Sequence, residues 1–264
     1  MKKILFPIYA VFAFVLFLNS TGCNNENIEK VASENVETAK KIEKPIKKEE
    51  PKQENNKTQA IDDAYITIST SMGDMEVKLY GETPEHTSNI VKLANEGFYD
   101  DLLFHRVING FMIQGGDPKS KNASPTARLG SGGPGYTIPA EFNPKFIHKK
   151  GAISAARTGG PSNPEKRSSG SQFYIVQGKP IPVSQLKQIE NSINQKNPGL
   201  NFAYTPEQIE IYTTIGGTPF LDMDYTVYGE VIKGMDVIDK IANTKTAPGD
   251  RPVTDVKMKI SVKQ

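Results

Sequence analysis

The sequence has no tryptophan and only one cysteine, Cys23, among its 264 residues. One cysteine cannot form a disulfide within the chain, so the folded part must be stabilised by its apolar core. The formal net charge is only +2, whereas a nucleic-acid-binding surface usually needs a strongly basic face. The three histidines have no metal-ligand spacing, and no G-x-S-x-G hydrolase motif occurs. We therefore expect no metal, no cofactor and no nucleic-acid partner.

The amino terminus has the pattern of a secretory signal. Lys2 and Lys3 precede an apolar run over residues 4–18, which is too short for a membrane span. The run leads to Ser20-Thr21-Gly22-Cys23, which resembles the lipobox of bacterial lipoproteins. The resemblance implies a lipoprotein signal peptide over residues 1–22 and lipidation of Cys23. The alternative is an ordinary signal peptide followed by a chance cysteine.

Residues 23–62 are rich in Lys, Glu, Asn, Gln and Thr. So little apolar area predicts a disordered polar tether, with a reach of roughly 30 to 40 Å for a flexible coil of this length. Lipidated Cys23 would hold the protein on a membrane without spanning it. We expect a lipid-anchored protein of the cell envelope, with its domain in the periplasm or at the cell surface. Asn24 after the cysteine weakly favours the outer membrane.

Alternation of apolar and polar residues begins at Tyr65 and predicts a hairpin that turns at residues 71–74. Thr83 and Pro84 then begin a predicted helix that ends before Gly97. Further strands are predicted over residues 151–156 and 171–176, whose small and apolar residues suit a barrel interior. Strands over residues 225–231 and 256–262 and a last helix over residues 235–242 are implied by the family resemblance described next.

The stretch Phe104 to Pro118 reads FHRVINGFMIQGGDP. Asn109-Gly110 predicts a two-residue hairpin turn, and the two strands would bring a guanidinium, an amide and large apolar side chains onto one patch. The stretch resembles the signature of the cyclophilin family of peptidyl-prolyl isomerases. The resemblance covers residues 64–264 and implies a mainly β fold, a closed eight-stranded antiparallel barrel capped by two helices. The implied domain spans residues 63–264.

The resemblance also implies the activity, acceleration of X-Pro bond rotation in proline-containing, unfolded or flexible polypeptides, by a monomer. The implied catalytic residues are Arg106, Phe111 and Gln114. The implied substrate-binding residues line a proline pocket and the groove beside it: His105, Met112, Ala156, Gln172, Tyr174, Phe220, Leu221 and Tyr225. The glycine-rich stretch 129–136 is not followed by a helix, so a phosphate loop is disfavoured. It resembles the family's loop beside the substrate groove.

Four positions differ from the common family pattern. Tyr174 stands where phenylalanine is usual, and Arg157 where many members have asparagine. Phe220 replaces a tryptophan and Tyr225 a histidine of eukaryotic members, which argues against strong binding of cyclosporin.

The chain also departs from the compact family plan at residues 177–219, which we call the insertion. Val183, Leu186, Ile189 and Ile193 recur at helical spacing, and a second helix is predicted after the capping-box residue Thr205. Because the insertion joins the strand bearing Tyr174 to the segment bearing Phe220, we expect it to border the pocket.

Two side chains outside the signature are predicted to face solvent. His86 lies in the first turn of a helix, and His148 is followed by two lysines. A second functional class also remains open, a cyclophilin-like binding module or holdase chaperone with incidental turnover. The combination of Arg106, Phe111 and Gln114 favours the enzyme, because binding alone would not require that arginine.

Overall fold

The hairpin at the start of the folded region shows how sequence alternation builds the core. The structure is a computed structural model that describes residues 61–263. Strands β1 (Ala64–Thr70) and β2 (Gly73–Leu79) pair in antiparallel fashion around a two-residue turn. Ile66 and Ile68 on one strand, with Met75 and Val77 on the other, are completely buried. Gly73 adopts φ +127°, a conformation that favours glycine.

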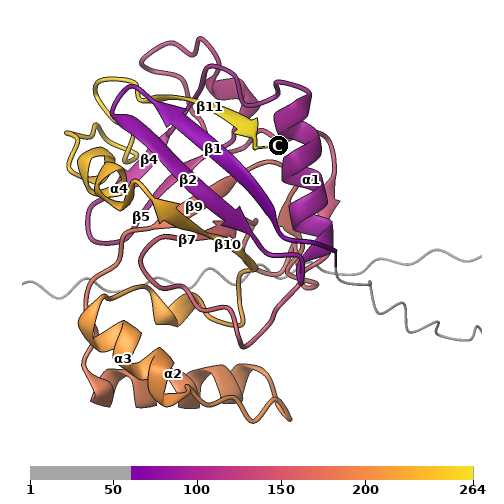
Figure 1. Ribbon diagram of the computed structural model, residues 1–264, viewed down its shortest axis with the longest axis vertical. Helices are drawn as coiled ribbons and strands as arrows, with labels where there is room; N and C mark the ends of the chain where they lie inside the picture. Colours follow the sequence, from indigo (N-terminus) through magenta and orange to yellow (C-terminus); the bar gives the residue numbers. More distant parts are fainter. Residues whose placement is uncertain (1–60, 264) are drawn as a thin grey trace, which may run out of the picture. The chain divides into compact units, whose positions relative to one another are not determined.

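Seven further strands extend this hairpin into one curled antiparallel sheet (Figure 1). Its order is β3-β11-β1-β2-β10-β7-β9-β5-β4. A separate pair is formed by β6 and β8. The bounds are β3 (Leu102–Leu103), β4 (Arg106–Ile108), β5 (Met112–Gly115), β6 (Thr137–Ile138), β7 (Ala152–Ala155), β8 (Ser168–Ser169), β9 (Phe173–Val176), β10 (Val227–Lys233) and β11 (Lys257–Val262).

The two edge strands of the main sheet, β3 and β4, follow one another in the chain. Only Phe104 and His105 separate them, so the backbone itself joins the two edges of the curled sheet. Next to this junction, the Phe104 amide donates to the carbonyl of Val256 at 2.9 Å, and the Val107 amide to that of Asp250 at 2.8 Å. The edges are therefore short and covered by the segment before β11.

Two helices pack against the sheet. Helix α1 (Pro84–Asn95) begins after Thr83 and buries Ile90, Leu93 and Ala94. Helix α4 (Met235–Ala242) buries Val237, Ile238, Ile241 and Ala242, its full apolar face. Short 3-10 turns, η1 (Pro118–Ser120) and η2 (Pro219–Leu221), precede two loops near the site described below.

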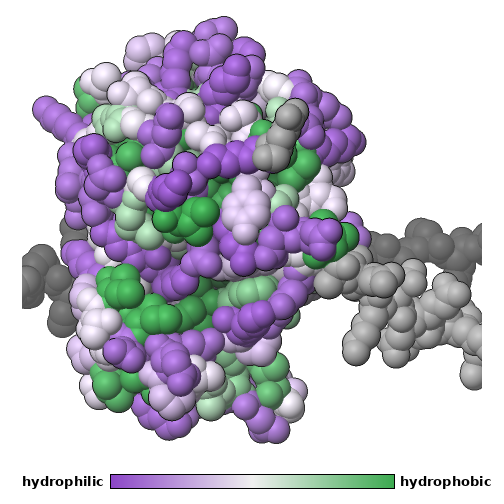
Figure 2. Space-filling view, in the orientation of Figure 1, coloured by the Kyte–Doolittle hydropathy of each residue, from purple (hydrophilic) through white to green (hydrophobic). Residues whose placement is uncertain are grey.

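The insertion forms the remaining helices, α2 (Val183–Lys196) and α3 (Pro206–Thr214). The capping box is present, because Thr205 and Gln208 exchange side-chain-to-backbone hydrogen bonds at 3.1 and 3.2 Å. The insertion buries Leu186, Ile193, Phe202, Tyr204 and Tyr212 in a second small core, to which Ile147 from the segment before β7 also contributes. Apolar side chains also gather in a band between the sheet and α3 (Figure 2).

The predicted fold class is confirmed: mainly β and antiparallel, with two helices on the sheet and two in the insertion. The count differs, nine strands in the main sheet and not eight. Residues 102–108 are the reason, because Phe104 and His105 interrupt what would otherwise be one strand.

The predicted lipoprotein signal at residues 1–22, Cys23 and most of the tether lie outside the described residues. No helix within residues 61–263 is long and apolar enough to cross a membrane.

Candidate active site

Strand periodicity divides the side chains of two neighbouring strands between the barrel core and an outer pocket. On β9, Phe173 and Ile175 join the main core, whereas Tyr174 and Val176 join a second apolar cluster on the other face. On β5, Ile113 points into the core, whereas Met112 lies with the second cluster. Alternation along a strand requires this division. The second cluster is the apolar wall of the site.

Residues opposite one another on adjacent strands place the polar groups in a row. Arg106 pairs with Gln114, Gln114 with Tyr174, and Tyr174 with Ser154. Paired residues share one face of a sheet. The guanidinium, the amide and the tyrosine ring are therefore neighbours because of strand register.

Hydrogen bonds connect this row to the neighbouring loop. Nη1 of Arg106 donates to Oε1 of Gln114 at 3.3 Å, and Nε2 of Gln114 donates to Oε1 of Gln172 at 3.1 Å. Gln172 in turn donates to the carbonyl of Gly132 at 2.7 Å. On the side of the guanidinium away from Gln114, Nε of Arg106 lies 3.4 Å from Oδ2 of Asp250. The guanidinium is thus held between two acceptors while its side chain stays 42% exposed.

The turn between β4 and β5 has three residues, and the predicted two-residue turn at Asn109-Gly110 is wrong. Ile108 pairs with Met112, so Phe111 belongs to the turn as well. Gly110 adopts φ +73°, and the Phe111 amide donates to the carbonyl of Ile108 at 3.0 Å. The longer turn leaves Phe111 half-buried at the rim, where its ring lies 5.7 Å from that of Phe220.

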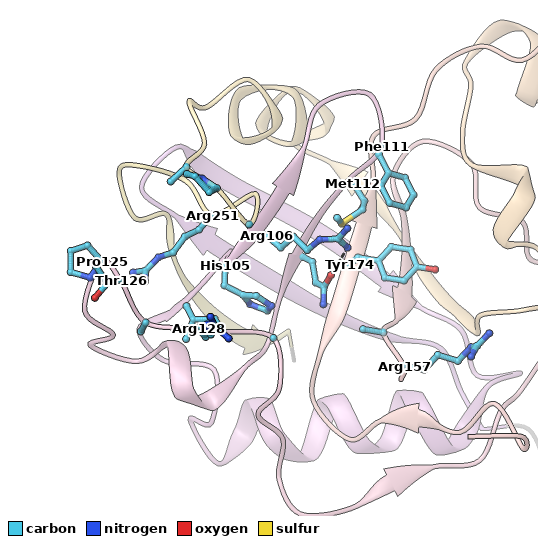
Figure 3. A pocket seen from close by; sticks show the side chains of 18 of the residues that line it. His105, Arg106, Phe111, Met112, Pro125, Thr126, Arg128, Arg157, Tyr174 and Arg251 are labelled. Carbon is cyan, nitrogen blue, oxygen red and sulfur yellow. Dashed lines mark hydrogen bonds between the residues drawn. The ribbon is translucent and has the colours of Figure 1, made fainter. Parts of the chain in front are cut away.

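These elements surround a pocket of about 980 Å³. Figure 3 shows the Arg106 head group between His105 on one side and Met112, Phe111 and Tyr174 on the other. Nine of the eleven residues implied by the resemblance line this pocket: His105, Arg106, Phe111, Met112, Gln114, Ala156, Tyr174, Leu221 and Tyr225. Gln172 lines an adjoining depression that shares Gln114 and Ala156 with the pocket. Phe220 is 53% exposed and lies outside the lining.

Sequence reasoning missed two segments of the lining. Pro125, Thr126, Ala127 and Arg128 form one wall, and Ala247, Pro248, Gly249 and Arg251 another. The Pro-Gly pair is a turn signal, but nothing near it in the sequence connects it to the signature. Strand β4 connects the turn at Pro248 and Gly249 to the signature, because the Val107 amide donates to the carbonyl of Asp250.

The insertion does not line the pocket. The lining passes from Tyr174 to Leu221 without any of residues 177–219. The insertion borders the pocket only from behind its wall, where the amides of Gln177 and Gly178 donate to the carbonyl of Phe111 at 2.9 and 3.0 Å. The segment immediately after the insertion does contribute, through Leu221 and Tyr225.

A buried carboxylate holds the loop that separates the pocket from the depression. Asp117 has no solvent exposure, and its oxygens accept from the amides of Lys119 at 2.8 Å, Gly132 at 3.2 Å and Gly130. A Cβ added at Gly132 would lie 2.0 Å from Oδ1 of Asp117. The loop can approach this carboxylate so closely only because glycine occupies that position.

His105 is the unsatisfied polar group of the pocket. Its side chain is buried, and neither ring nitrogen has a hydrogen-bond partner. Burial lowers the pKa of His105 below its ordinary value of 6.5, against the opposing field of Asp117. The neutral ring therefore carries one donor and one acceptor, both buried behind the surface of the pocket.

The two other histidines contradict the sequence prediction that they face solvent. His86 is 3% and His148 0% exposed. The cause is long-range in both cases: Glu141 accepts from Nδ1 of His86 at 2.5 Å, and Asp222 accepts from Nδ1 of His148 at 2.7 Å. No group of three or more metal-ligating side chains occurs within the part of the chain that the structure describes.

The fold and the pocket define a class of protein: a curled antiparallel barrel with an open, largely apolar pocket beside a fixed guanidinium. The sequence matches the family model of cyclophilin type peptidyl-prolyl cis-trans isomerase/CLD over residues 65–262. A protein of Staphylococcus aureus strain USA300, named peptidyl-prolyl cis-trans isomerase, is 37% identical over 192 residues, covering 72% of this chain and 87% of that protein. A relative of the same name in Staphylococcus saprophyticus is 36% identical with the same coverage.

A solved structure shows the same fold. The crystal structure of a cyclophilin type peptidyl-prolyl cis-trans isomerase of Cryptosporidium parvum aligns with a TM-score of 0.55 at 22% identity, covering 77% of this chain and 99% of that one. The chain belongs to the cyclophilin family of peptidyl-prolyl cis-trans isomerases. Its activity is the cis-trans isomerisation of peptidyl-prolyl bonds.

Proposed function

We propose that Arg106 is the catalytic group and that the pocket described above receives the proline of the substrate. The X-Pro bond is a tertiary amide whose rotation barrier is about 18–20 kcal/mol, and uncatalysed exchange takes about 10 to 100 s. Lowering this barrier requires no bond to be broken. It requires a site that favours the twisted amide over the planar one.

In the twisted state the prolyl nitrogen regains its lone pair. A permanently charged donor beside that nitrogen stabilises the twisted state more than the planar ground state. The Arg106 guanidinium fits this role because it lies in the pocket and is held by Gln114 and Asp250. This fixed cation beside an apolar wall is the observation that carries the proposal.

The remaining groups bind the substrate. The proline ring packs against Phe111, Met112, Tyr174 and Leu221, which line the same pocket. Gln114 and Gln172 face the polypeptide backbone, one in the pocket and one in the adjoining depression. The Cryptosporidium relative has also been crystallised in the presence of the dipeptide Ala-Pro, which supports prolyl peptides as the ligand class for this chain.

Proline exchange in a short peptide tests this assignment. Wild-type residues 61–264 should speed cis-trans exchange measured by NMR, and Arg106→Ala should lower kcat/KM by about 10² to 10³, the range for removing one donor to a developing charge. Lys233→Ala is the matched control, since Lys233 is an exposed cation paired with Glu76. A holdase would instead keep aggregation-suppressing activity unchanged in Arg106→Ala, with little turnover in either protein.

We further propose that the enzyme acts in the cell envelope on exported polypeptides, attached to a membrane through lipidated Cys23. Support comes from the sequence alone: the basic start, the short apolar run and the Thr21-Gly22-Cys23 end of the lipobox-like segment. A single acyl chain anchors only marginally, whereas two anchor stably. Cys23→Ser in the full chain should lose metabolic palmitate labelling and move from the detergent phase to the aqueous phase. Retention of label by Cys23→Ser would exclude this anchor.

We also propose that the enzyme acts as a monomer, because the barrel and the insertion each bury an apolar core within one chain. Light scattering during gel filtration should give the mass of one chain at micromolar concentration. A stable dimer would contradict this.

A further inference from the structure

Buried polar groups connect the insertion to the wall of the proline pocket. Oδ1 of Asp222 accepts from Nδ1 of His148 at 2.7 Å and from the His148 backbone amide at 2.9 Å. Nε2 of His148 lies 2.9 Å from the hydroxyl of Tyr174. All three side chains are at most 5% exposed. Tyr174 also lines the pocket, so it connects this buried group to the pocket wall.

The insertion supplies the other half of the network. The hydroxyls of Tyr204 and Tyr212 donate to Oδ2 of Asp222 at 2.7 and 2.6 Å. Tyr212 is fully buried and lies on α3. Together with His148, these tyrosines give the carboxylate four hydrogen bonds, so its charge is compensated although only 3% of the residue is exposed.

The direction of each bond follows from the chemistry of the groups. A carboxylate only accepts, so Nδ1 of His148 and both tyrosine hydroxyls carry the hydrogens shared with Asp222. In the tautomer protonated at Nδ1, the hydroxyl of Tyr174 donates to Nε2. Burial raises the pKa of Tyr174, Tyr204 and Tyr212 above the ordinary value, so all three hydroxyls remain donors at neutral pH.

The backbone of the insertion also docks tightly against His148. The amide of Thr218 donates to the carbonyl of His148 at 2.8 Å, and that of Lys150 to the carbonyl of Gly216 at 2.9 Å. A Cβ on Gly217 would lie 2.3 Å from the carbonyl oxygen of His148 and 2.6 Å from the Tyr212 ring. This approach leaves His148 no room to move independently of the insertion.

We propose that Asp222 and His148 are positioning residues through which the insertion fixes the ring of Tyr174 at the pocket wall. The proposal rests on the assignment of this pocket to the substrate proline. It gives a reason for tyrosine at position 174, where only the hydroxyl can reach Nε2 of His148. It also gives the insertion an effect on catalysis without contact with the substrate.

Two substitutions at one position separate positioning from packing. An asparagine amide overlaps Nδ1 of an imidazole, whereas a glutamine amide overlaps Nε2. His148→Asn should keep the bond to Asp222, lose the bond to Tyr174 and lower kcat/KM by about tenfold, the equivalent of one hydrogen bond. His148→Gln should retain more activity than His148→Asn. If the two variants are equally impaired, or neither is, the hydrogen bond to Tyr174 does not position the ring.

A double-mutant cycle makes the test specific to the hydroxyl. Tyr174→Phe should lower kcat/KM by a similar factor, and His148→Asn should then cause no further loss in the Tyr174→Phe background. Tyr204→Phe combined with Tyr212→Phe should also lower kcat/KM, and this effect too should vanish with Tyr174→Phe. Multiplicative effects would overturn the proposal. Tyr228→Phe is the matched control, a buried tyrosine of the main core.

A spectroscopic readout keeps this inference separate from the catalytic assignment. The chain has three histidines, so the ¹⁵N signals of His148 can be assigned by comparison with His148→Asn. The Nε2 signal should shift in Tyr174→Phe, and more weakly in the Tyr204→Phe, Tyr212→Phe double variant. An unchanged Nε2 signal refutes the network even in an active enzyme. A shifted signal in a chain without turnover would instead refute the catalytic assignment.

Discussion

Arg106 and Gln114 face each other across the β4–β5 ladder, and Nη1 of the guanidinium donates to the amide oxygen at 3.3 Å. The same amide donates onward to Gln172, so its orientation is fixed by the two contacts together. The substrate would meet a cation and an amide whose relative positions are set before binding. Such preorganisation reduces the entropy lost when a flexible peptide is bound.

Gln114→Ala tests this preorganisation. The change frees the Arg106 side chain and leaves Gln172 without its donor, so kcat/KM should fall by about tenfold, the scale of one hydrogen bond. Gln114→Glu should keep the Arg106 side chain better ordered than Gln114→Ala does, because a carboxylate still accepts from the guanidinium. NMR exchange on one prolyl peptide measures both variants. Wild-type rates in Gln114→Ala would show that the amide has no part in the site.

Phe220→Trp should turn the rim of the pocket into a fluorescent reporter. The chain has no tryptophan, and the Phe220 ring is 53% exposed beside Phe111. Binding of a prolyl peptide should shield the introduced indole and move its emission to shorter wavelength. The variant should also bind cyclosporin more tightly than wild type, because it supplies an indole N–H donor. Titration with the peptide should give the same affinity from the wavelength shift of the emission and from its shielding against a quencher. An unchanged emission spectrum at saturating peptide would place the ligand elsewhere.

Asp117→Ala should destabilise the loop between the pocket and the depression. Three backbone amides, those of Lys119, Gly130 and Gly132, lose a charged acceptor. The expected loss in the free energy of unfolding is about 3 kcal/mol, together with a higher KM for peptides. Asp117→Asn retains one acceptor oxygen and should lose less. Urea unfolding measures the first effect, and equal stability of Asp117→Ala and wild type would disprove the bracing role.

His105 should make stability fall at acidic pH. Its folded pKa is lowered from 6.5, chiefly by burial, so the unfolded chain binds the proton more readily than the folded chain. The free energy of unfolding should therefore be insensitive to His105 above pH 6.5 and decline as the pH falls below that value. The decline between pH 7.5 and pH 5 should be smaller in His105→Gln, measured by urea unfolding. An identical decline would show that the ring is protonated without cost.

Local signals predicted most of the fold. The β1–β2 hairpin, α1, α2 and α3 lie where apolar periodicity, Pro84 and the Thr205 capping box predict them, and α4 lies where the family resemblance predicts it. These features depend on neighbours a few residues away in the chain. The signature stretch also predicted which side chains lie together around one pocket, because Arg106, Phe111 and Gln114 share one hairpin.

The errors have a common physical origin in distant partners. The two lysines after His148 predict an exposed side chain, yet its partner Asp222 lies 74 residues away and holds it in the interior. The wall from Pro125 to Arg128 and the turn at Pro248 reach the pocket only through tertiary contacts. Phe220 lies at the rim beside Phe111 and not in the lining. Its exposure depends on this tertiary contact, which its neighbours in the sequence do not reveal.

The junction at Phe104 and His105 has a consequence for an enzyme whose substrates are polypeptides. An open sheet edge offers unpaired amides and carbonyls to any extended polypeptide, and strand addition of that kind leads to aggregation. Here the two terminal strands have only two and three residues, and the chain runs directly from one to the other. Within residues 61–263, the main sheet therefore presents no long open edge to which a bound polypeptide could add as a further strand.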